Sequence, residues 1–171
     1  MNETTGQVTM KGNPLTLTGT QVEAGEHAPD FQVVNNALAT VRLSSLRGKV
    51  LILSSVPSLD TPVCDTQTRR FNQEATGLSD DLEVLTISMD LPFAQARWCG
   101  AAGIDRVRTL SDHRDASFGT AFGLLIAELR LLARAVFVLD REGVIRYKQV
   151  VREIAEEPDY RAAMDAARKL L

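Results

Sequence analysis

The sequence predicts an α/β fold in which a mixed central sheet is flanked by helices. Apolar runs of strand length occur at 50–56, 82–89 and 135–139, and they are rich in β-branched residues. Helix-start signals follow the first two runs, which is typical of strands joined by helices. The third run leads through a turn into another apolar segment, which indicates a terminal antiparallel hairpin.

The individual elements follow in order. Two polar–apolar alternations around a Gly-Asn-Pro turn predict an N-terminal β-hairpin over residues 7–18, and residues 29–34 form a further extended segment. The pattern then predicts strands at 50–56, 82–89, 107–110, 135–139 and 144–151, with helices at 62–76, from Pro92 to Gly100 or Gly103, in part of 112–125 and from Pro158 onward. The apolar face of the last helix is expected to comprise Tyr160, Met164, Ala167 and Leu171.

From Val50 onward this β-α-β-α-β-β-α order is that of a thioredoxin-like domain. The N-terminal hairpin is an extension of it, and one βα unit is an insertion. No linker, repeat or low-complexity segment divides the chain, so residues 1–171 are predicted to form a single domain.

The composition is that of a soluble globular protein, with 44% apolar and 24% charged residues in a chain of 171. The net charge is −3 and no basic tract is present, so nucleic acid is not an expected partner. No apolar run approaches the length of a membrane span, and the N-terminus lacks the pattern of a signal peptide. We therefore expect a cytoplasmic protein with no membrane partner.

The chain has two cysteines, Cys64 and Cys99. A reducing compartment disfavours a permanent disulfide between them and permits a transient catalytic one. There is no C-x-x-C pair, and the two histidines, His27 and His113, are isolated, so the spacing of a zinc site is missing. Neither a metal nor another cofactor is expected.

Cys64 lies where a predicted strand leads into a predicted helix. The strand stops at Pro57, and the helix restarts with Thr61 as N-cap and Pro62 as its first residue. Cys64 is then the third helical residue, near unpaired backbone N–H groups and the positive end of the helix dipole. Both favour an anion, so this position predicts a stabilised thiolate that acts as a nucleophile.

Position alone leaves a second interpretation open. Cys64 also belongs to an apolar helix stripe, and a cysteine on such a stripe is usually an inert core residue. The other members of the stripe are Thr68, Phe71, Ala75 and Leu78.

Three further residues favour the nucleophile. Arg134 interrupts the apolar run 131–138, where a guanidinium is costly unless it meets an anion. A structural salt bridge is the usual partner, and a thiolate with its substrate is the alternative. The Thr61 hydroxyl can cap the helix or donate to the thiolate, and Pro57 shapes the loop above the site.

The segment 57–64, Pro-Ser-Leu-Asp-Thr-Pro-Val-Cys, matches the P-x-x-x-T-x-x-C motif of the peroxiredoxins. More narrowly, the chain resembles the bacterial thiol peroxidases, which are atypical two-cysteine peroxiredoxins. Segments 90–100 and 133–138 and the N-terminal hairpin carry this closer match, which covers almost the whole chain. One departure is Trp98, where family members often have Phe before the second cysteine.

The resemblance implies a role for each residue. Cys64 resembles the peroxidatic cysteine, whose thiolate attacks the O–O bond of a hydroperoxide and becomes a sulfenic acid. Cys99 resembles the resolving cysteine, which condenses with that sulfenic acid in the same chain. Thr61 and Arg134 resemble the residues that position and polarise the peroxide, and Pro57 resembles the proline that shields the site.

The resemblance also implies partners and a movement. Thioredoxin is the implied reductant, alkyl or lipid hydroperoxides are preferred to hydrogen peroxide, and the protein is a homodimer. A disulfide requires Cα atoms about 4.4 to 6.8 Å apart. Cys64 and Cys99 lie on the first turn of one predicted helix and near the end of another, so we expect local unwinding on oxidation. Trp98 should report this movement by fluorescence.

Three other functions compete with the peroxidase. A thioredoxin-like disulfide exchanger would be expected to use the absent C-x-x-C pair. A cysteine hydrolase needs a histidine base, and only the fold could bring His113 to Cys64. A peroxide-responsive redox sensor would use the same two cysteines, and turnover with thioredoxin would distinguish it from the enzyme.

Overall fold

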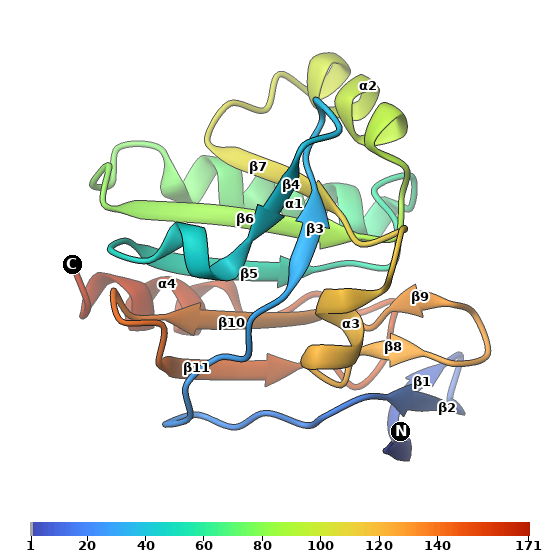
Figure 1. The fold of residues 1–171 in the computed structure, drawn as a ribbon. Helices are drawn as coiled ribbons and strands as arrows, with labels where there is room; N and C mark the ends of the chain where they lie inside the picture. Colours follow the sequence, from blue (N-terminus) through green and yellow to red (C-terminus); the bar gives the residue numbers. More distant parts are fainter. Residues whose placement is uncertain (1) are drawn as a thin grey trace.

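The computed structural model describes residues 2–171 and confirms the α/β prediction (Figure 1). Its larger sheet comprises β3 (Gln32–Val34), β4 (Thr40–Arg42), β5 (Val50–Ser55), β6 (Leu82–Ser88), β7 (Val107–Ser111), β10 (Ala135–Leu139) and β11 (Ile145–Val150). The strand order is β11-β10-β5-β6-β7-β3-β4. β5, β6 and β7 are parallel, while β10 pairs antiparallel with β5 and β3 with β7, so the sheet is mixed as predicted.

A smaller sheet has the order β1-β2-β8-β9. Its strands are β1 (Glu3–Met10), β2 (Asn13–Thr18), β8 (Leu125–Ile126) and β9 (Leu131–Leu132). The predicted hairpin over 7–18 is confirmed, but β1 begins at Glu3 and the turn is Lys11-Gly12, so Asn13 and Pro14 already belong to β2. The sequence did not predict β8 and β9, because two residues are too few to show a strand periodicity.

The helices are α1 (Pro62–Ala75), α2 (Pro92–Ala102), α3 (Ser117–Ala121) and α4 (Tyr160–Arg168), and η1 (Leu43–Leu46) is a 3-10 helix. α2 ends at Gly103, one of its two predicted ends, which adopts the left-handed conformation (φ 67°). The prediction for α4 was wrong at both ends. Asp159 is its N-cap, accepting a hydrogen bond from the Ala162 N–H (2.9 Å), and Leu171 lies beyond the helix and is exposed.

Two clusters of buried apolar side chains pack the helices α1, α3 and α4 and the N-terminal hairpin against the larger sheet. α1 and α4 lie behind that sheet in Figure 1, and their side chains pack on one of its faces. Phe71 of α1 meets Tyr160 of α4 edge-to-face, with 5.2 Å between ring centroids. The other cluster joins α3 and the N-terminal hairpin to the sheet, and includes Phe118 and Leu17. Burying each such side chain contributes roughly 1.5–3 kcal/mol to the free energy of folding. Because the α1 side chains are packed on the sheet in this way, the first turn of α1 is held close to the end of β5.

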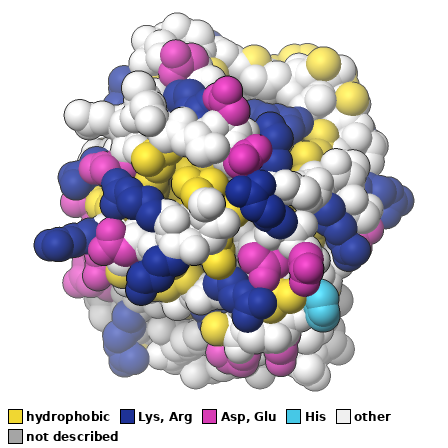
Figure 2. Space-filling model, turned by 90° about the vertical axis from the view of Figure 1, so that its left-hand side faces the viewer, with side chains coloured by type: hydrophobic (Ala, Val, Ile, Leu, Met, Phe, Trp, Pro, Cys, Tyr) yellow, Lys and Arg dark blue, Asp and Glu magenta, His cyan; other side chains and the backbone are white. Residues whose placement is uncertain are grey.

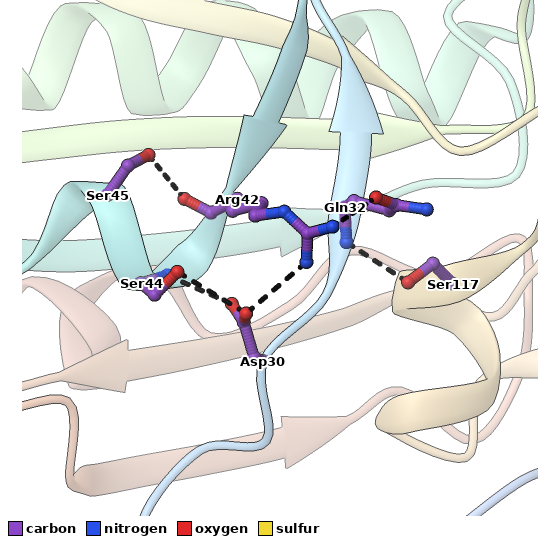
Figure 3. Close-up of polar contacts among 6 residues, drawn as sticks. All are labelled: Asp30, Gln32, Arg42, Ser44, Ser45 and Ser117. Carbon is purple, nitrogen blue, oxygen red and sulfur yellow. Dashed lines mark hydrogen bonds and ion pairs between the residues drawn. The ribbon is translucent and has the colours of Figure 1, made fainter.

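Polar contacts fasten the β3–β4 hairpin at the edge of the larger sheet (Figure 3). Asp30 accepts a hydrogen bond from the Ser44 N–H (2.9 Å) and faces the Arg42 guanidinium at 3.7 Å. Arg42 also donates to the Gln32 side chain (2.9 Å), and the Gln32 N–H donates to the Ser117 hydroxyl (3.0 Å). Exposed ion pairs contribute little, so the bonds to backbone N–H groups matter most here.

Charged side chains of both signs alternate on the face shown in Figure 2, where the loops before β5 and β6 lie. Ion pairs join Arg141 to Asp81 (3.4 Å) and Arg108 to Glu83 (2.7 Å). Within residues 2–171, no helix combines the length and the apolar character that crossing a membrane requires.

Asp112 follows β7 and holds the start of α3. Its carboxylate accepts hydrogen bonds from the N–H groups of Phe118 (3.0 Å) and Gly119 (2.8 Å). Burial raises the pKa of Asp112 from 3.8 to about 6, although these N–H donors oppose the rise. The folded protein therefore retains this proton at pH values where the unfolded chain has lost it.

This shift predicts how stability depends on pH. As the pH rises from about 4 to 6, the unfolded state releases the Asp112 proton first, so the free energy of unfolding should fall by about 2 kcal/mol. Urea unfolding of wild type and Asp112→Asn at pH 4.5 and 6.5 measures this contribution. The decrease should be smaller in the variant by that amount, and equal decreases in both proteins would contradict the assignment.

Candidate functional site

The site lies where β5 ends and α1 begins. β5 ends at Ser55, Pro57 is buried in the following loop, and Thr61 is the N-cap of α1 with Pro62 at the first helical position, as predicted. Cys64 is fully buried, with an exposed fraction of 0%. The sequence therefore placed this cysteine correctly at the helix N-terminus.

The hydroxyl of Thr61 does neither of the things expected of it. It donates to the carbonyl of Ser58 (2.8 Å), and it makes no hydrogen bond that caps the helix. Pro62 has no N–H, and the first helical bond is that of the Asp65 N–H to the Thr61 carbonyl (3.0 Å). Among residues 2–171, the N–H groups of Val63 and Cys64 consequently lack an acceptor and remain available to an anion.

Arg134 immediately precedes β10 and reaches Cys64. Its Nη2 donates to the Cys64 Sγ at 3.2 Å, and its Nη1 donates to the Gln67 Oε1 at 2.8 Å. Nε and Nη2 also donate to the carbonyl of Ile154, at 3.1 and 2.8 Å. Gln67 is fixed in turn, because its Nε2 donates to the Ser54 hydroxyl on β5 (2.7 Å). The guanidinium is thus held in one orientation with one N–H group on the sulfur.

The charge of Arg134 is almost completely removed from solvent, with an exposed fraction of 2%. Within residues 2–171 it has no carboxylate partner, so the structural salt bridge that the sequence left open is not found. A buried positive charge is costly unless an anion accompanies it. In this structure the guanidinium is instead surrounded by the Ile154 carbonyl, the Gln67 side chain and the sulfur of Cys64.

An apolar cavity of about 250 Å³ opens beside Arg134. Pro57 and Thr61 line it, as does Met10 from the N-terminal hairpin. Its other lining residues are Pro62, Val63, Leu129, Leu131, Ile154 and Ala155. The cavity brings three predicted site residues, Pro57, Thr61 and Arg134, to one concave surface next to Cys64.

Cys99 lies on α2 and has different neighbours from Cys64. Its sulfur shares a hydrogen bond with the Thr109 hydroxyl on β7 (3.4 Å), and that hydroxyl donates to the Asn36 side chain (3.2 Å). Both cysteines are free thiols, and Cys99 is partly exposed. The structure therefore does not join the two predicted redox residues directly.

Two residues of the site escaped the sequence analysis. Gln67 orients Arg134, and its spacing of three residues from Cys64 along α1 was a usable signal, because such residues share a helix face. Asp90 accepts hydrogen bonds from the Ser58 hydroxyl (2.7 Å) and the Leu59 N–H (2.8 Å), and so fixes the loop before Cys64. Asp90 begins segment 90–100, which carries the family resemblance, but no local pattern indicates its role, because this contact depends on the meeting of two distant loops.

The hydrolase alternative finds no support at this site. The side-chain partner of the Cys64 sulfur within residues 2–171 is Arg134, and no histidine there bonds to it. His113 lies in the turn after β7, where its backbone N–H donates to the Ser111 hydroxyl (3.3 Å). In the same part of the chain, no three His, Cys, Asp or Glu side chains gather as they would around a metal ion.

Comparisons with protein families, with individual relatives and with solved structures agree with one another. Residues 23–164 match the protein family described as Redoxin. The chain is 57% identical to the thiol peroxidase of Bacillus subtilis (strain 168) over 165 residues, covering 96% of this chain and 98% of that protein. It is 56% identical to the thiol peroxidase of Listeria innocua serovar 6a over 163 residues, covering 95% and 98%. The crystal structure of a peroxiredoxin-like protein from Aquifex aeolicus matches with a TM-score of 0.91 at 39% identity, covering 100% of both chains.

Proposed function

The chain belongs to the redoxin family as a thiol-dependent peroxidase with a thioredoxin-like fold, and from this premise we propose that Cys64 is its peroxidatic cysteine. The observation that carries the proposal is the buried guanidinium of Arg134, which has no carboxylate partner within residues 2–171 and donates to the Cys64 Sγ. A thiolate at Cys64 neutralises that charge, and the thiolate is the reactive form of cysteine.

The chemical step is a displacement at oxygen. The Cys64 thiolate attacks the terminal oxygen of a hydroperoxide, forming an S–O bond while the O–O bond breaks. The leaving alkoxide takes up a proton to become an alcohol, and Cys64 becomes a sulfenic acid. Arg134 stabilises the negative charge as it moves from sulfur to the leaving oxygen, and the free N–H groups of Val63 and Cys64 assist it.

Cys99 then resolves the sulfenic acid in the same chain. Its thiol attacks the Cys64 sulfur, water leaves with the sulfenic oxygen, and a disulfide results. A dithiol reductant of the thioredoxin type returns both thiols by exchange, which places the enzyme in a reducing compartment such as the cytoplasm. We also propose a homodimer, because Leu91 and Phe93 expose large apolar side chains on α2 and the loop before it.

The cavity beside Arg134 favours hydroperoxides with an apolar substituent. Its lining is almost entirely apolar, and Met10 and Leu129 are exposed at 39% and 37%. Apolar side chains placed in this way gain free energy by burying an alkyl or aryl group, whereas hydrogen peroxide offers no such group.

Replacing both Met10 and Leu129 with Ser is expected to lower kcat/KM for cumene hydroperoxide roughly tenfold and to change the value for hydrogen peroxide little. Leu38→Ser is the matched control, because Leu38 is exposed at 49% and does not line the cavity. Equal losses for both peroxides would contradict an alkyl-binding role of this surface.

The test of the function is peroxide consumption coupled to thioredoxin, thioredoxin reductase and NADPH. Wild type is expected to turn over many times with cumene hydroperoxide, and Cys64→Ser is expected to show the rate of the blank. A wild-type protein that is oxidised once but does not turn over with thioredoxin would instead favour the redox sensor.

A further inference from the structure

The residues next to the two cysteines bind each other. Trp98 precedes Cys99 on α2, and its indole Nε1 donates to the Oδ1 of Asp65, which follows Cys64 on α1, at 2.8 Å. A hydrogen bond to an ionised carboxylate is about twice as strong as a neutral one. The Trp98 side chain also packs on the apolar cluster that contains Cys64, Val56 and Leu59. This contact joins the two helices that carry the redox residues.

Arg69 supports the contact between Trp98 and Asp65. Its Nε donates to the other carboxylate oxygen of Asp65 at 2.9 Å, and its guanidinium lies 5.6 Å from the centre of the Trp98 ring. Its Nη1 also donates to the carbonyl of Ala102 at the end of α2 (3.4 Å). Arg69 therefore contacts both the indole and the helix that carries it, and it fixes the carboxylate that the indole binds.

This arrangement holds Cys99 away from Cys64. Successive residues on a helix point in directions that differ by about 100°. Trp98 faces α1, whereas Cys99 faces β7 and bonds to Thr109. Turning the Cys99 sulfur toward Cys64 therefore requires α2 to rotate or unwind, and this movement carries the indole of Trp98 away from Asp65.

We propose that the bond between Trp98 and Asp65, supported by Arg69, is a latch that sets the rate at which Cys99 resolves the oxidised Cys64. The proposal rests on the proposed function and names positioning residues for its second step. A phenylalanine at position 98 would fill similar space but has no N–H to donate. The latch is therefore a property of this chain's tryptophan.

The latch has a second consequence, because the sulfenic acid has two fates. In resolution, Cys64–SOH and Cys99–SH give the disulfide and water. In overoxidation, a second hydroperoxide transfers one oxygen to Cys64–SOH, giving the sulfinic acid and an alcohol. A latch that slows resolution prolongs the life of the sulfenic acid and increases the share that a second peroxide oxidises.

The test is a single turnover of the full-length reduced protein with cumene hydroperoxide, quenched with acid and a thiol-blocking reagent and read by mass spectrometry. Trp98→Phe removes the donor and retains an aromatic ring, and Arg69→Met removes only the support. Glu74→Gln is the control, because it breaks a similar i,i+4 pair on α1, Arg70 to Glu74 at 2.9 Å, away from the latch.

Trp98→Phe is expected to convert sulfenic acid to disulfide roughly tenfold faster than wild type, since it loses a charge-assisted hydrogen bond. It should also form less sulfinic acid at a fixed excess of peroxide. Arg69→Met should give a smaller increase, and Glu74→Gln should match wild type. The rate of sulfenic acid formation, measured in the same runs, separates an effect on resolution from an effect on Cys64 itself.

An unchanged resolution rate in Trp98→Phe, or a change confined to sulfenic acid formation, would overturn the latch while leaving the peroxidase intact. Equal acceleration in Glu74→Gln would also overturn it, because the effect would then reflect general loosening of α1. If wild type forms neither sulfenic acid nor disulfide, the proposed function itself fails, and the two failures are thereby distinguished.

Discussion

Replacing Arg134 with Ala is expected to slow the oxidation of Cys64 by hydroperoxide by two to three orders of magnitude, about the loss seen when one donor to a developing negative charge is removed. The variant lacks both the N–H group on the Cys64 sulfur and the buried charge that a thiolate neutralises. Stopped-flow measurement of the first oxidation at pH 7 gives the rate directly. A rate within a factor of three of wild type would remove Arg134 from the reaction.

Arg134→Lys distinguishes charge from geometry. Lysine retains the positive charge but lacks the planar fork that binds Cys64, Gln67 and the Ile154 carbonyl together. We expect an intermediate rate. Gln67→Leu leaves the guanidinium in place without its anchor and should also be slower than wild type. Thermal unfolding of each variant shows whether a slow rate reflects loss of the fold, because Arg134 also bonds to the backbone.

Cys99→Ser is expected to consume one equivalent of hydroperoxide per chain and then stop. Cys64 retains its partners, since Cys99 bonds to Thr109 and not to any residue of the Arg134 cluster. The sulfenic acid formed has no resolving thiol in the chain and should persist long enough for a dimedone-type reagent to trap it. Multiple-turnover activity with thioredoxin should therefore fall to the level of Cys64→Ser.

Two controls make this result specific. Thr109→Val removes the partner of the Cys99 sulfur while both cysteines remain, and it should still turn over. Adding a small thiol to Cys99→Ser should restore slow turnover by reducing the sulfenic acid from solution. Full thioredoxin-dependent activity in Cys99→Ser would show that the reductant reaches Cys64 directly and that Cys99 is dispensable.

Local sequence rules predicted the elements around Cys64 well. Thr61 is the N-cap residue of α1 as predicted, and Pro62 marks the helix start through the preference of proline for the first helical position. The cost of burying Arg134 within an apolar run predicts an anion partner from the sequence alone. Both inferences depend on the properties of residues that lie within a few positions of each other in the sequence.

The predictions that were wrong, and the contact that was not predicted, depend on interactions that these local rules do not include. The Thr61 hydroxyl turned to the Ser58 carbonyl, because a tight turn offered an acceptor that the helix rule does not consider. α4 begins at Tyr160 and not at Pro158, because the Asp159 side chain caps the helix by accepting a hydrogen bond from the Ala162 N–H. This cap stabilises the helix start more than a proline at the first helical position would. The contact between Trp98 and Asp65 depends on how two helices pack, and no periodicity within either one contains that information.

The most direct test of the peroxidase mechanism is the mass of the reduced wild-type chain after one equivalent of cumene hydroperoxide under non-reducing conditions. The expected result is a monomeric mass lower by two hydrogen atoms, and a proteolytic digest in which the Cys64 and Cys99 peptides are joined to each other. A mass that stays higher by one oxygen atom, or a disulfide that links two chains, would contradict resolution of Cys64 by Cys99 within one chain.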